Sequence, residues 1–195
     1  MSKKYQNQLT AFNALTEALE QIPTIGKKSA IKMAYSLSVE DKFLGVKLAH
    51  CLENAIQKIH FCQLCGGLSE NEICEICIDD ERDTSQLCII LHPRDIFTIE
   101  ESNGYNGRYF VLPASLEELD IHLLGQIITQ NQVQEIIFAF SPTLANEAIM
   151  LFVEDKLQDF NLTFSKIAQG VPTGIGLDHV DSLSLSKAIS QRNKI

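Results

Sequence analysis

The sequence has no apolar run long enough to cross a membrane as a helix. Such a helix needs about 18 or more consecutive apolar residues, and no stretch of the 195 residues reaches that length. The N-terminal segment MSKKYQNQLTAF has two lysines but no apolar segment behind them, which is not the pattern of a secretory signal. We therefore expect neither a membrane protein nor a secreted one, and the expected location is the cytoplasm.

Internal repeats, low-complexity tracts and long linkers are also missing from the chain. Hydrophobic residues make up 45% and charged residues 21%, which is typical of a globular protein and not of a disordered one. The length leaves room for one compact domain or two small ones.

Arginine is absent from the first 60 residues, where eight lysines and five acidic residues leave a net charge of +3. The rest of the chain holds eight basic and twenty acidic residues, a net charge of −12. The total of −9 argues against a protein coated in nucleic acid, but the basic N-terminal part fits contact through one face. A chance imbalance on a solvated helical surface would give the same numbers.

Residues 5–60 have a helical pattern. Leu9, Phe12, Leu15 and Leu19 recur at steps of three and four, which predicts a helix with one apolar stripe. Pro23 and Gly26 then predict a turn, and a second helix follows in KKSAIKMAYSL. Ser38 and Asp41 mark the start of a third helix, FLGVKLAHCLENAIQKI.

From residue 87 onward, short apolar runs alternate with helical patterns, and the NGYNG segment between two of them predicts a turn. This alternation predicts an α/β fold whose parallel sheet is flanked by helices. Strands are expected at 87–91, 108–112, 135–140 and 162–167, and helices at 93–102, 123–132 and 143–160.

Four of the six cysteines form two CxxC pairs separated by eight residues: Cys62, Cys65, Cys74 and Cys77. This spacing predicts a tetrahedral zinc site with Zn–S distances of ~2.3 Å. Because four sulfurs fill the coordination shell, the zinc would be structural and not catalytic, and His60 would not be a ligand. Iron could occupy the same ligands. Free thiols or a redox dithiol would need a βαβ context that this turn-rich segment lacks.

The other two cysteines are expected in the protein core and not as nucleophiles. Cys51 lies on the apolar face of the third predicted helix, and Cys88 lies inside the first predicted strand. The cysteine segment between them has little apolar content, so a metal is expected to hold it together.

Residues 19–37, LEQIPTIGKKSAIKMAYSL, resemble a helix–hairpin–helix motif. In such a motif the N–H groups at the start of the second helix bind a phosphate without reading sequence. Lys27, Lys28 and Lys32 follow the turn and are the candidate DNA contacts, with Lys28 and Lys32 one helical turn apart. An ordinary pair of helices with solvated lysines would show the same pattern.

The order of these parts resembles the RecR family of bacterial recombination mediators over essentially the whole chain. The resemblance lies in IPTIGKKSA, the four cysteines, CIILHPRDIFTIEESNGYNGRYFVL, IIFAFSPTLANEA and IAQGVPTGIGLDHVDSLSLSKAI. It implies a Toprim domain in the α/β body, a dimeric or tetrameric ring, and partnership with RecO. Together the two proteins would help to load RecA onto single-stranded DNA covered by SSB at gaps and breaks; whether RecF takes part stays open.

The resemblance also implies a division of the chain and roles for single residues. A helix–hairpin–helix unit would occupy residues 1–56, the zinc finger 57–80, the Toprim domain 81–168, and a segment for subunit contacts 169–195. By position, Lys28 and Lys32 match the family's DNA-facing residues, the four cysteines match its zinc ligands, and Glu147 matches an acidic residue of its RecO-facing surface.

The chain departs from the family where catalytic Toprim enzymes place magnesium-binding carboxylates. Leu91 and His92 stand where the first of these acids is expected, and Ser141–Pro142–Thr143 stands where the later Asp pair is expected. Two further acids of the family are replaced, at Ala145 and at Gly176. Glu147 and Asp95 alone are too few oxygen ligands for a magnesium site. We therefore expect a DNA-binding platform and not an enzyme, with a RecO-facing surface weakened by the same losses.

The leading hypothesis is a non-enzymatic, sequence-independent DNA-binding clamp in recombinational repair, located at the nucleoid. The alternatives are a magnesium-dependent Toprim nuclease or primase-like enzyme, and a zinc-bearing protein-interaction adaptor that does not touch DNA. Gly170, Gly174 and Gly176 fit neither common phosphate-loop pattern, so they do not predict nucleotide binding. The preferred DNA structure and the choice between dimer and tetramer stay open.

Overall fold

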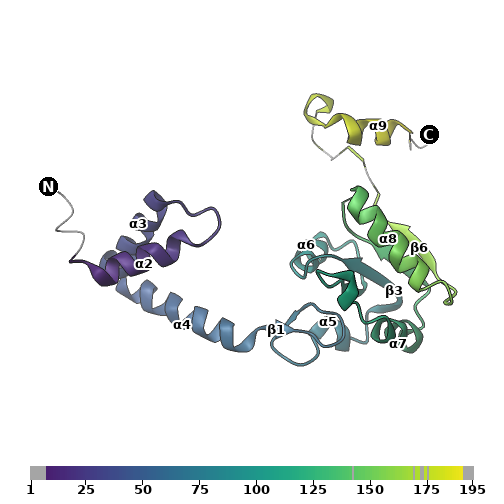
Figure 1. The fold of residues 1–195 in the computed structure, drawn as a ribbon, viewed down its shortest axis with the longest axis horizontal. Helices are drawn as coiled ribbons and strands as arrows, with labels where there is room; N and C mark the ends of the chain where they lie inside the picture. The colour runs from purple at the N-terminus through teal and green to yellow at the C-terminus, as the bar shows by residue number, and fades with distance from the viewer. Residues whose placement is uncertain (1–7, 142, 169, 172–173, 175, 191–195) are drawn as a thin grey trace. The chain divides into compact units, whose positions relative to one another are not determined.

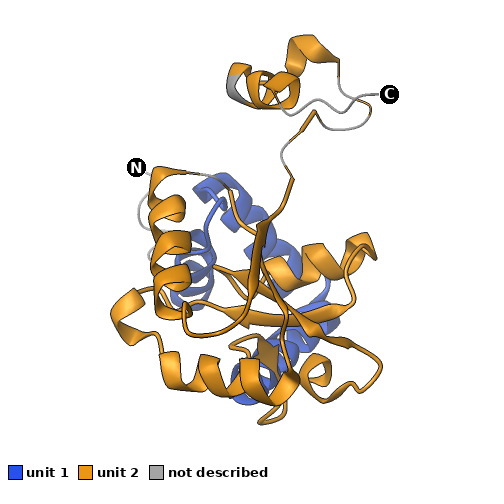
Figure 2. Ribbon diagram, turned by 90° about the vertical axis from the view of Figure 1, so that its right-hand side faces the viewer, with its two compact units in different colours: residues 1–59 blue, residues 60–195 orange. Residues whose placement is uncertain are grey.

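The computed structural model describes residues 8–141, 143–168, 170–171, 174 and 176–190. It divides into two compact units, residues 1–59 and residues 60–195 (Figure 2). The helices and strands are labelled in Figure 1. Among the described residues, no helix is both long enough and apolar enough to span a membrane.

Unit 1 is helical, as the apolar periodicity predicts. It contains α2 (Thr10–Glu20), α3 (Lys27–Tyr35), the π-helical segment η1 (Ser36–Glu40) and α4 (Lys42–Lys58). Its small core consists of Leu19, Ala30 and Ala34, with Phe12, Leu15 and Ile25 packed against them. The two alanines are fully buried, because only a small side chain lets α3 lie so close to α2.

The connection between α3 and α4 needs two special residues. The Asp41 carboxylate accepts a hydrogen bond from the Leu44 N–H at 2.8 Å and thereby caps α4, which confirms the predicted helix start. A Cβ atom on Gly45 would lie 2.2 Å from the Leu37 carbonyl oxygen. Glycine is therefore required where the two backbone segments meet.

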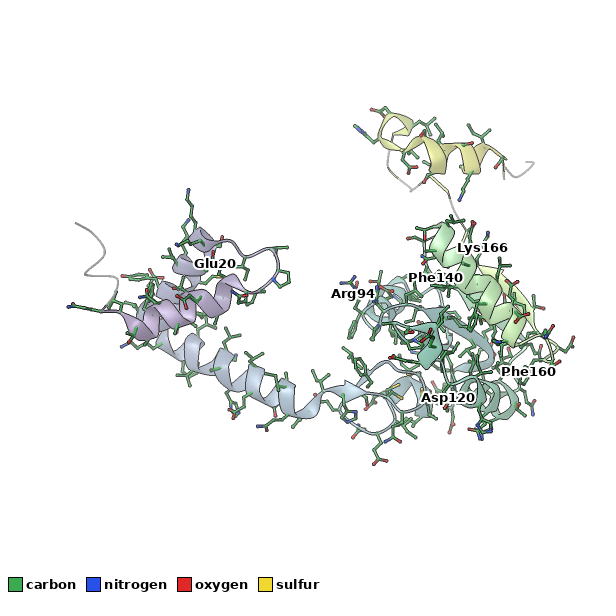
Figure 3. All side chains as sticks on the ribbon, in the orientation of Figure 1. Glu20, Arg94, Asp120, Phe140, Phe160 and Lys166 are labelled. Atoms are coloured by element: carbon green, nitrogen blue, oxygen red, sulfur yellow. The ribbon has the colours of Figure 1, made fainter. Side chains whose placement is uncertain are left out.

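Helix α4 has an apolar stripe but no buried residue. The stripe comprises Leu44, Leu48, Leu52, Ile56 and Ile59, all of them exposed. Cys51, on the same side of the helix, is exposed as well, so the prediction of a buried core residue at this position is wrong. Helical periodicity identifies the apolar face of a helix, but it does not say whether the same chain supplies the surface that covers it. Figure 3 draws the side chains of α4 as sticks along the helix.

Unit 2 begins with the zinc-finger segment and continues into the α/β body. The finger contains a short antiparallel hairpin, β1 (His60–Phe61) with β2 (Leu68–Ser69), and a one-turn helix, α5 (Glu75–Ile78). The body has four parallel strands in the order β4-β3-β5-β6. These are β3 (Asp83–Ile90), β4 (Gly107–Val111), β5 (Glu135–Phe138) and β6 (Thr163–Lys166).

The predicted parallel sheet and its flanking helices are confirmed. The helices are α6 (Asp95–Ser102), α7 (Ile121–Asn131) and α8 (Leu144–Lys156), with a short turn of helix at η2 (Leu116–Glu118). In register, Ile89 of the central strand β3 lies between Phe110 of β4 and Phe138 of β5. Asn103 ends α6 with a φ of 51°, as expected for the first Asn-Gly pair of the NGYNG turn.

The strand β3 divides the core of the body into two parts because its side chains alternate. Leu87 and Ile89 face the larger cluster, to which α7 and α8 contribute Leu124, Ile127, Ile128, Met150 and Val153. Cys88 and Ile90 face the smaller cluster, with Ile96 of α6 and Tyr109 of β4. Cys88 is 3% exposed, which confirms it as a small core residue.

The C-terminal part contains η3 (Leu177–His179) and α9 (Ser182–Ser190). The role of residues 169–195 in subunit contacts stays a prediction, as do the domain boundaries given above.

An ion pair fixes the segment that leaves the finger. Both terminal nitrogens of Arg82 donate to the Glu100 carboxylate on α6, one of them at 2.9 Å, and Arg82 also donates to the Gly107 carbonyl of β4 at 3.1 Å. The Tyr109 hydroxyl donates to the same carboxylate at 2.6 Å. These donors, with Arg82 the strongest contributor, hold the pKa of Glu100 below its usual range.

We expect Glu100→Gln to destabilise unit 2 by about 1–3 kcal/mol at pH 7, because Arg82 then loses its carboxylate partner. Since the pKa of Glu100 is lower in the folded than in the unfolded state, its contribution is present above roughly pH 4.3 and is lost as the pH falls through the folded pKa. Urea unfolding of the wild type and the variant at several pH values measures the difference in their free energies of unfolding. A difference in stability that persists unchanged to pH 3 would contradict it.

Candidate metal centre and nucleic-acid interface

The first cysteine pair lies on the β1–β2 hairpin. The Cys62 N–H donates to the Gly67 carbonyl at 2.7 Å, and the Gly66 N–H donates to the Cys62 carbonyl at 2.9 Å. Gly66 has a φ of 72°, a left-handed conformation that favours glycine. This tight turn brings the Cys62 and Cys65 thiols to the same side of the hairpin.

The second pair lies at the start of α5. Cys74 is the N-cap of this helix, and the Cys77 N–H donates to the Cys74 carbonyl at 3.0 Å. One helical turn therefore places the second pair of thiols together, next to the first pair.

All four sulfur atoms lie within 4.8 Å of one another. The Sγ atoms of Cys65 and Cys74 are 3.5 Å apart, and those of Cys62 and Cys77 are 3.9 Å apart. A tetrahedron with Zn–S distances of ~2.3 Å has edges of about 3.8 Å, so the four thiols fit one zinc ion. The predicted structural zinc site is thus brought together, while His60 is exposed and does not belong to the cluster.

Backbone amides stabilise negative charge on two of the sulfurs. The Gly67 N–H donates to the Cys65 Sγ and the Cys74 N–H donates to the Cys62 Sγ, both at 3.3 Å. A hydrogen bond from the Cys77 thiol is the main cause that lowers the pKa of Cys65 to about 6, and the same bond raises the pKa of Cys77. Burial raises the pKa of Cys74 to about 11. A divalent ion would replace the protons that Cys74 and Cys77 retain at neutral pH.

The metal site is attached to the α/β body. The Val111 N–H, at the end of β4, donates to the Cys65 carbonyl at 2.8 Å. A Cβ atom on Gly67 would lie 2.9 Å from the Ile96 side chain of α6, so the second glycine allows close contact. Ile76 of α5 packs on the smaller core cluster. The metal therefore holds a hairpin and a helix turn in the shape that fits the edge of the sheet.

The predicted helix–hairpin–helix turn joins α2 to α3 in unit 1. Thr24 has a φ of 74°, unusual for a β-branched residue, and Gly26 is the N-cap of α3. No side chain caps α3, and its first turn has no acidic residue. The Ser29 and Ala30 N–H groups donate to the Gly26 carbonyl at 2.9 and 3.0 Å. The Lys27 and Lys28 N–H groups have no carbonyl one turn before them in the helix, so these two can bind an anion.

Lys27, Lys28 and Lys32 are exposed on α3. Within the described part of the chain, none of the three forms an ion pair. Their positions suit phosphate contact, and their assignment as DNA contacts stays a prediction.

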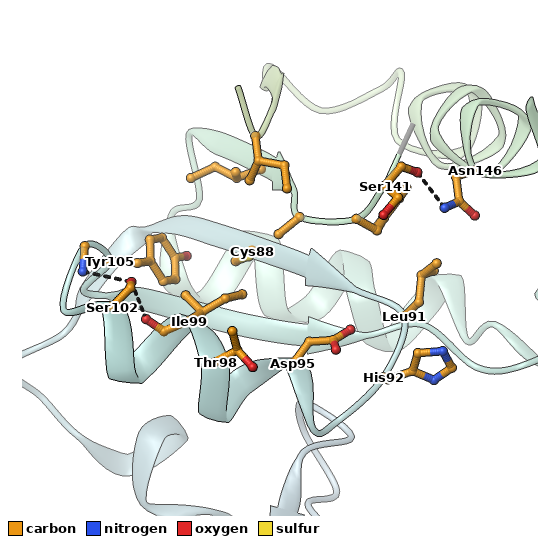
Figure 4. A pocket seen from close by; sticks show the side chains of 15 residues that line it. Cys88, Leu91, His92, Asp95, Thr98, Ile99, Ser102, Tyr105, Ser141 and Asn146 are labelled. Atoms are coloured by element: carbon orange, nitrogen blue, oxygen red, sulfur yellow. Dashed lines mark hydrogen bonds between the residues drawn. The ribbon is translucent and has the colours of Figure 1, made fainter. Parts of the chain in front are cut away.

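The ends of β3 and β5, where the sequence lacks the expected carboxylates, border a crevice of about 790 Å³ (Figure 4). The connections after β3 and β5 run to opposite edges of the sheet. In α/β proteins, ligands bind in the crevice between two strands whose connections diverge in this way. The crevice is largely apolar inside, with Leu91, His92 and Asp95 on one side. On the other side the Asn146 amide donates to the Ser141 carbonyl at 2.6 Å.

The two candidate magnesium ligands do not line the same hollow. Asp95 lines the crevice, whereas Glu147 lines a second hollow of about 370 Å³ beside Lys166. Among the described residues, the four cysteines are the one group of three or more His, Cys, Asp or Glu side chains close enough to share an ion. Pro142, at one of the replaced acidic positions, lies outside the described residues.

Sequence patterns missed the residues that attach the finger. Arg82, Tyr109 and Ile96 come from separate elements, and no spacing in the sequence connects them. Gly66–Gly67 directly after Cys65 was a usable signal, since two adjacent glycines often mark close approach of another segment. Of the residues that line the crevice, the sequence analysis singled out Leu91, His92, Asp95 and Ser141 but not Tyr105 or Asn146.

Three family models match the chain. Residues 12–56 match the helix-hairpin-helix model of RecR, residues 59–79 match the model of the four-cysteine zinc finger domain of RecR, and residues 85–168 match the Toprim domain. Together with the sulfur geometry, the zinc-finger match supports one structural zinc ion per chain.

Curated relatives match over nearly the full length. The chain is 52% identical over 190 residues to the recombination protein RecR of Helicobacter pylori, covering 97% of this chain and 98% of the relative. It is 53% identical over 190 residues to that of a Nitratiruptor species, covering 97% and 100%. For Campylobacter jejuni subsp. doylei the identity is 51% over 187 residues, covering 96% and 98%.

We expect Cys65→Ser to reduce the zinc content from about one ion per chain to near zero, because three thiolates and a weakly binding hydroxyl cannot hold the ion. The melting temperature should fall as well, because without the ion the hairpin no longer holds in place the backbone carbonyl at position 65, which accepts a hydrogen bond from the Val111 N–H of β4. Metal analysis by mass spectrometry measures zinc and iron together and so distinguishes the two metals. Cys51→Ser is the matched control and should keep the metal; loss of metal in both variants, or in neither, would contradict the site.

Proposed function

The chain belongs to the RecR family of recombination proteins, which act in recombinational DNA repair, and from this we propose that it is a non-enzymatic, sequence-independent DNA-binding clamp. The observation that carries the proposal is the start of α3. There an uncapped helix N-terminus lies next to three exposed lysines on the basic unit of an acidic chain. Contacts of this kind bind phosphates and not bases, which makes binding independent of sequence and sensitive to salt.

The absence of catalytic activity is part of the proposal. The separation of Asp95 from Glu147, and Leu91 in the crevice wall, support it because metal-dependent phosphoryl chemistry needs oxygen ligands that converge on the ion. A nuclease or primase-like Toprim enzyme is therefore the weaker candidate.

We further propose that the protein forms a ring of two or four copies. The uncovered stripe on α4 supports this, because a helix whose large apolar residues are all exposed has a surface to bury against a second chain. In a ring, several copies of the basic unit 1 could line one opening while the acidic bodies lie outside.

The proposed partners follow from the family and are not tested by the fold. RecO would bind the protein and help it to load RecA onto SSB-covered single-stranded DNA, and Glu147 is the proposed contact on the Toprim domain. The proposed location is the cytoplasm, at the nucleoid.

We expect Lys28→Glu/Lys32→Glu to weaken binding to gapped DNA by about tenfold or more at low salt. On single-stranded DNA, each phosphate contact contributes about 0.7 to the slope of log affinity against log salt concentration. Removing two contacts should therefore reduce the size of that slope by about 1.4 per bound chain. Fluorescence anisotropy at several salt concentrations, with magnesium present, measures both quantities.

The matched control is Lys156→Glu/Lys166→Glu, which makes the same charge change on the α/β body and should bind DNA nearly as the wild type does. Equal loss in both double variants would show that only net charge matters. No loss in the Lys28/Lys32 variant would favour the adaptor alternative, and magnesium-dependent cleavage of the DNA would favour the nuclease.

We expect Leu52→Glu to reduce the size of the assembly, because a charge in the apolar stripe of α4 would have to be buried between chains. Light scattering after size-exclusion chromatography measures the mass. Glu53→Lys changes a neighbouring residue away from the stripe and should leave the mass unchanged. A wild-type protein that is monomeric at micromolar concentration would contradict the ring.

A further inference from the structure

The zinc finger has an exposed apolar pair on the outside of its hairpin. Phe61 of β1 and Leu68 of β2 are directly paired in the register, so their side chains lie on the same side of the hairpin. Phe61 is 65% exposed and Leu68 is 41% exposed, whereas Cys62, the next residue along the chain, is buried. Because side chains alternate along a strand, the pair points away from the metal.

The segment that carries this pair is strongly acidic. Residues 60–81 contain no lysine or arginine but six acidic residues, all exposed: Glu70, Glu72, Glu75, Asp79, Asp80 and Glu81. Four thiolates around one zinc ion add a net charge of about −2. Of the six acids, only Asp79 is in an ion pair with a described residue, Arg82 at 3.7 Å.

Two of these acids lie close to the apolar pair in the fold. Glu70 follows β2 directly. Gln63 lies two residues after Phe61, and its N–H donates a hydrogen bond to the Glu72 carbonyl at 3.0 Å. The hairpin therefore presents an exposed apolar pair on a segment whose backbone neighbours, Glu70 and Glu72, are exposed acidic residues, and this composition suits a protein-binding surface with a charged rim.

The charge decides what kind of molecule this surface binds. Nucleic acid is repelled by the surface, since every phosphate would meet uncompensated carboxylates. A protein that presents lysine or arginine around an apolar or aromatic residue would instead neutralise the acids and bury Phe61 and Leu68.

We propose that this finger surface, Phe61 and Leu68 with Glu70 and Glu72, is a docking surface for a basic region of a partner protein. The inference rests on the proposed partnership with RecO and gives that partner a second contact. It also accounts for the acids missing from the Toprim domain at Leu91 and Ala145 and from the C-terminal segment at Gly176: an acidic surface for a basic partner is still present, but it lies on the finger.

The test is binding of purified RecO from the same organism to the full-length, zinc-loaded protein, measured by biolayer interferometry at several salt concentrations. Phe61→Ser/Leu68→Ser removes the apolar centre, and Glu70→Lys/Glu72→Lys reverses the rim charge. The matched control, Asp155→Lys/Asp159→Lys, makes the same charge change at the end of α8. Zinc content and melting temperature are measured for each variant.

Both finger variants should bind RecO about tenfold or more weakly while they keep zinc, and the charge variant should also lose most of the salt dependence. The control should remain within about twofold of the wild type. Hydrogen–deuterium exchange on the unmodified protein gives a readout without any substitution, and RecO should protect the backbone of residues 60–72.

Other outcomes overturn the inference. If the wild type binds RecO and both finger variants bind equally well, or if residues 60–72 gain no protection, the finger is not the docking surface although the partnership stands. If the finger variants change DNA affinity or assembly mass and not RecO binding, the surface serves DNA or a second copy. If the wild type does not bind RecO at any salt concentration, the proposed partnership fails and the inference fails with it.

Discussion

Four thiol groups within 4.8 Å of one another are the constraint on which the rest of unit 2 depends. Without a cation, thiolates at this distance repel one another, and burial favours their protonated forms. A bound ion removes both penalties and makes the hairpin and α5 a single rigid piece. That piece then provides the Cys65 carbonyl for β4 and the Ile76 side chain for the smaller core cluster. The metal thus contributes to function through the shape it maintains and not through chemistry at the ion.

Positive and negative charge are separated along the chain, and this separation fits the two proposed contacts, one with DNA and one with a partner protein. The basic unit 1 carries an uncapped helix start with exposed lysines, which suits phosphate binding. The finger and the α/β body are acidic, which disfavours phosphate and favours basic protein surfaces. A protein that must hold DNA and also recruit another protein can keep the two contacts apart by this means, because each surface repels the ligand of the other.

Much of the fold could be predicted from local patterns. The alternation of short apolar runs with helical periods located all four strands of the sheet, because buried parallel strands and the helices between them leave distinct signatures over 5–15 residues. Asp41 identified the start of α4 through its capping chemistry. The error at Cys51 has a different origin: the pattern showed an apolar face correctly, but burial depends on a second surface, and the surface that would cover α4 is not present among the described residues of unit 1.

The sequence by itself determined which residues can bind a metal and in what geometry, since two CxxC pairs contain nearly all the information of a four-sulfur site. It also determined the α/β class of the body and the position of the basic turn. Only the tertiary structure decided that Asp95 and Glu147 line different hollows, that Arg82 and Glu100 join the end of the finger to α6, and that Phe61 and Leu68 form an exposed pair beside acidic residues. These facts depend on contacts between residues distant in the chain, and such contacts are set by how the elements pack together and not by any local spacing.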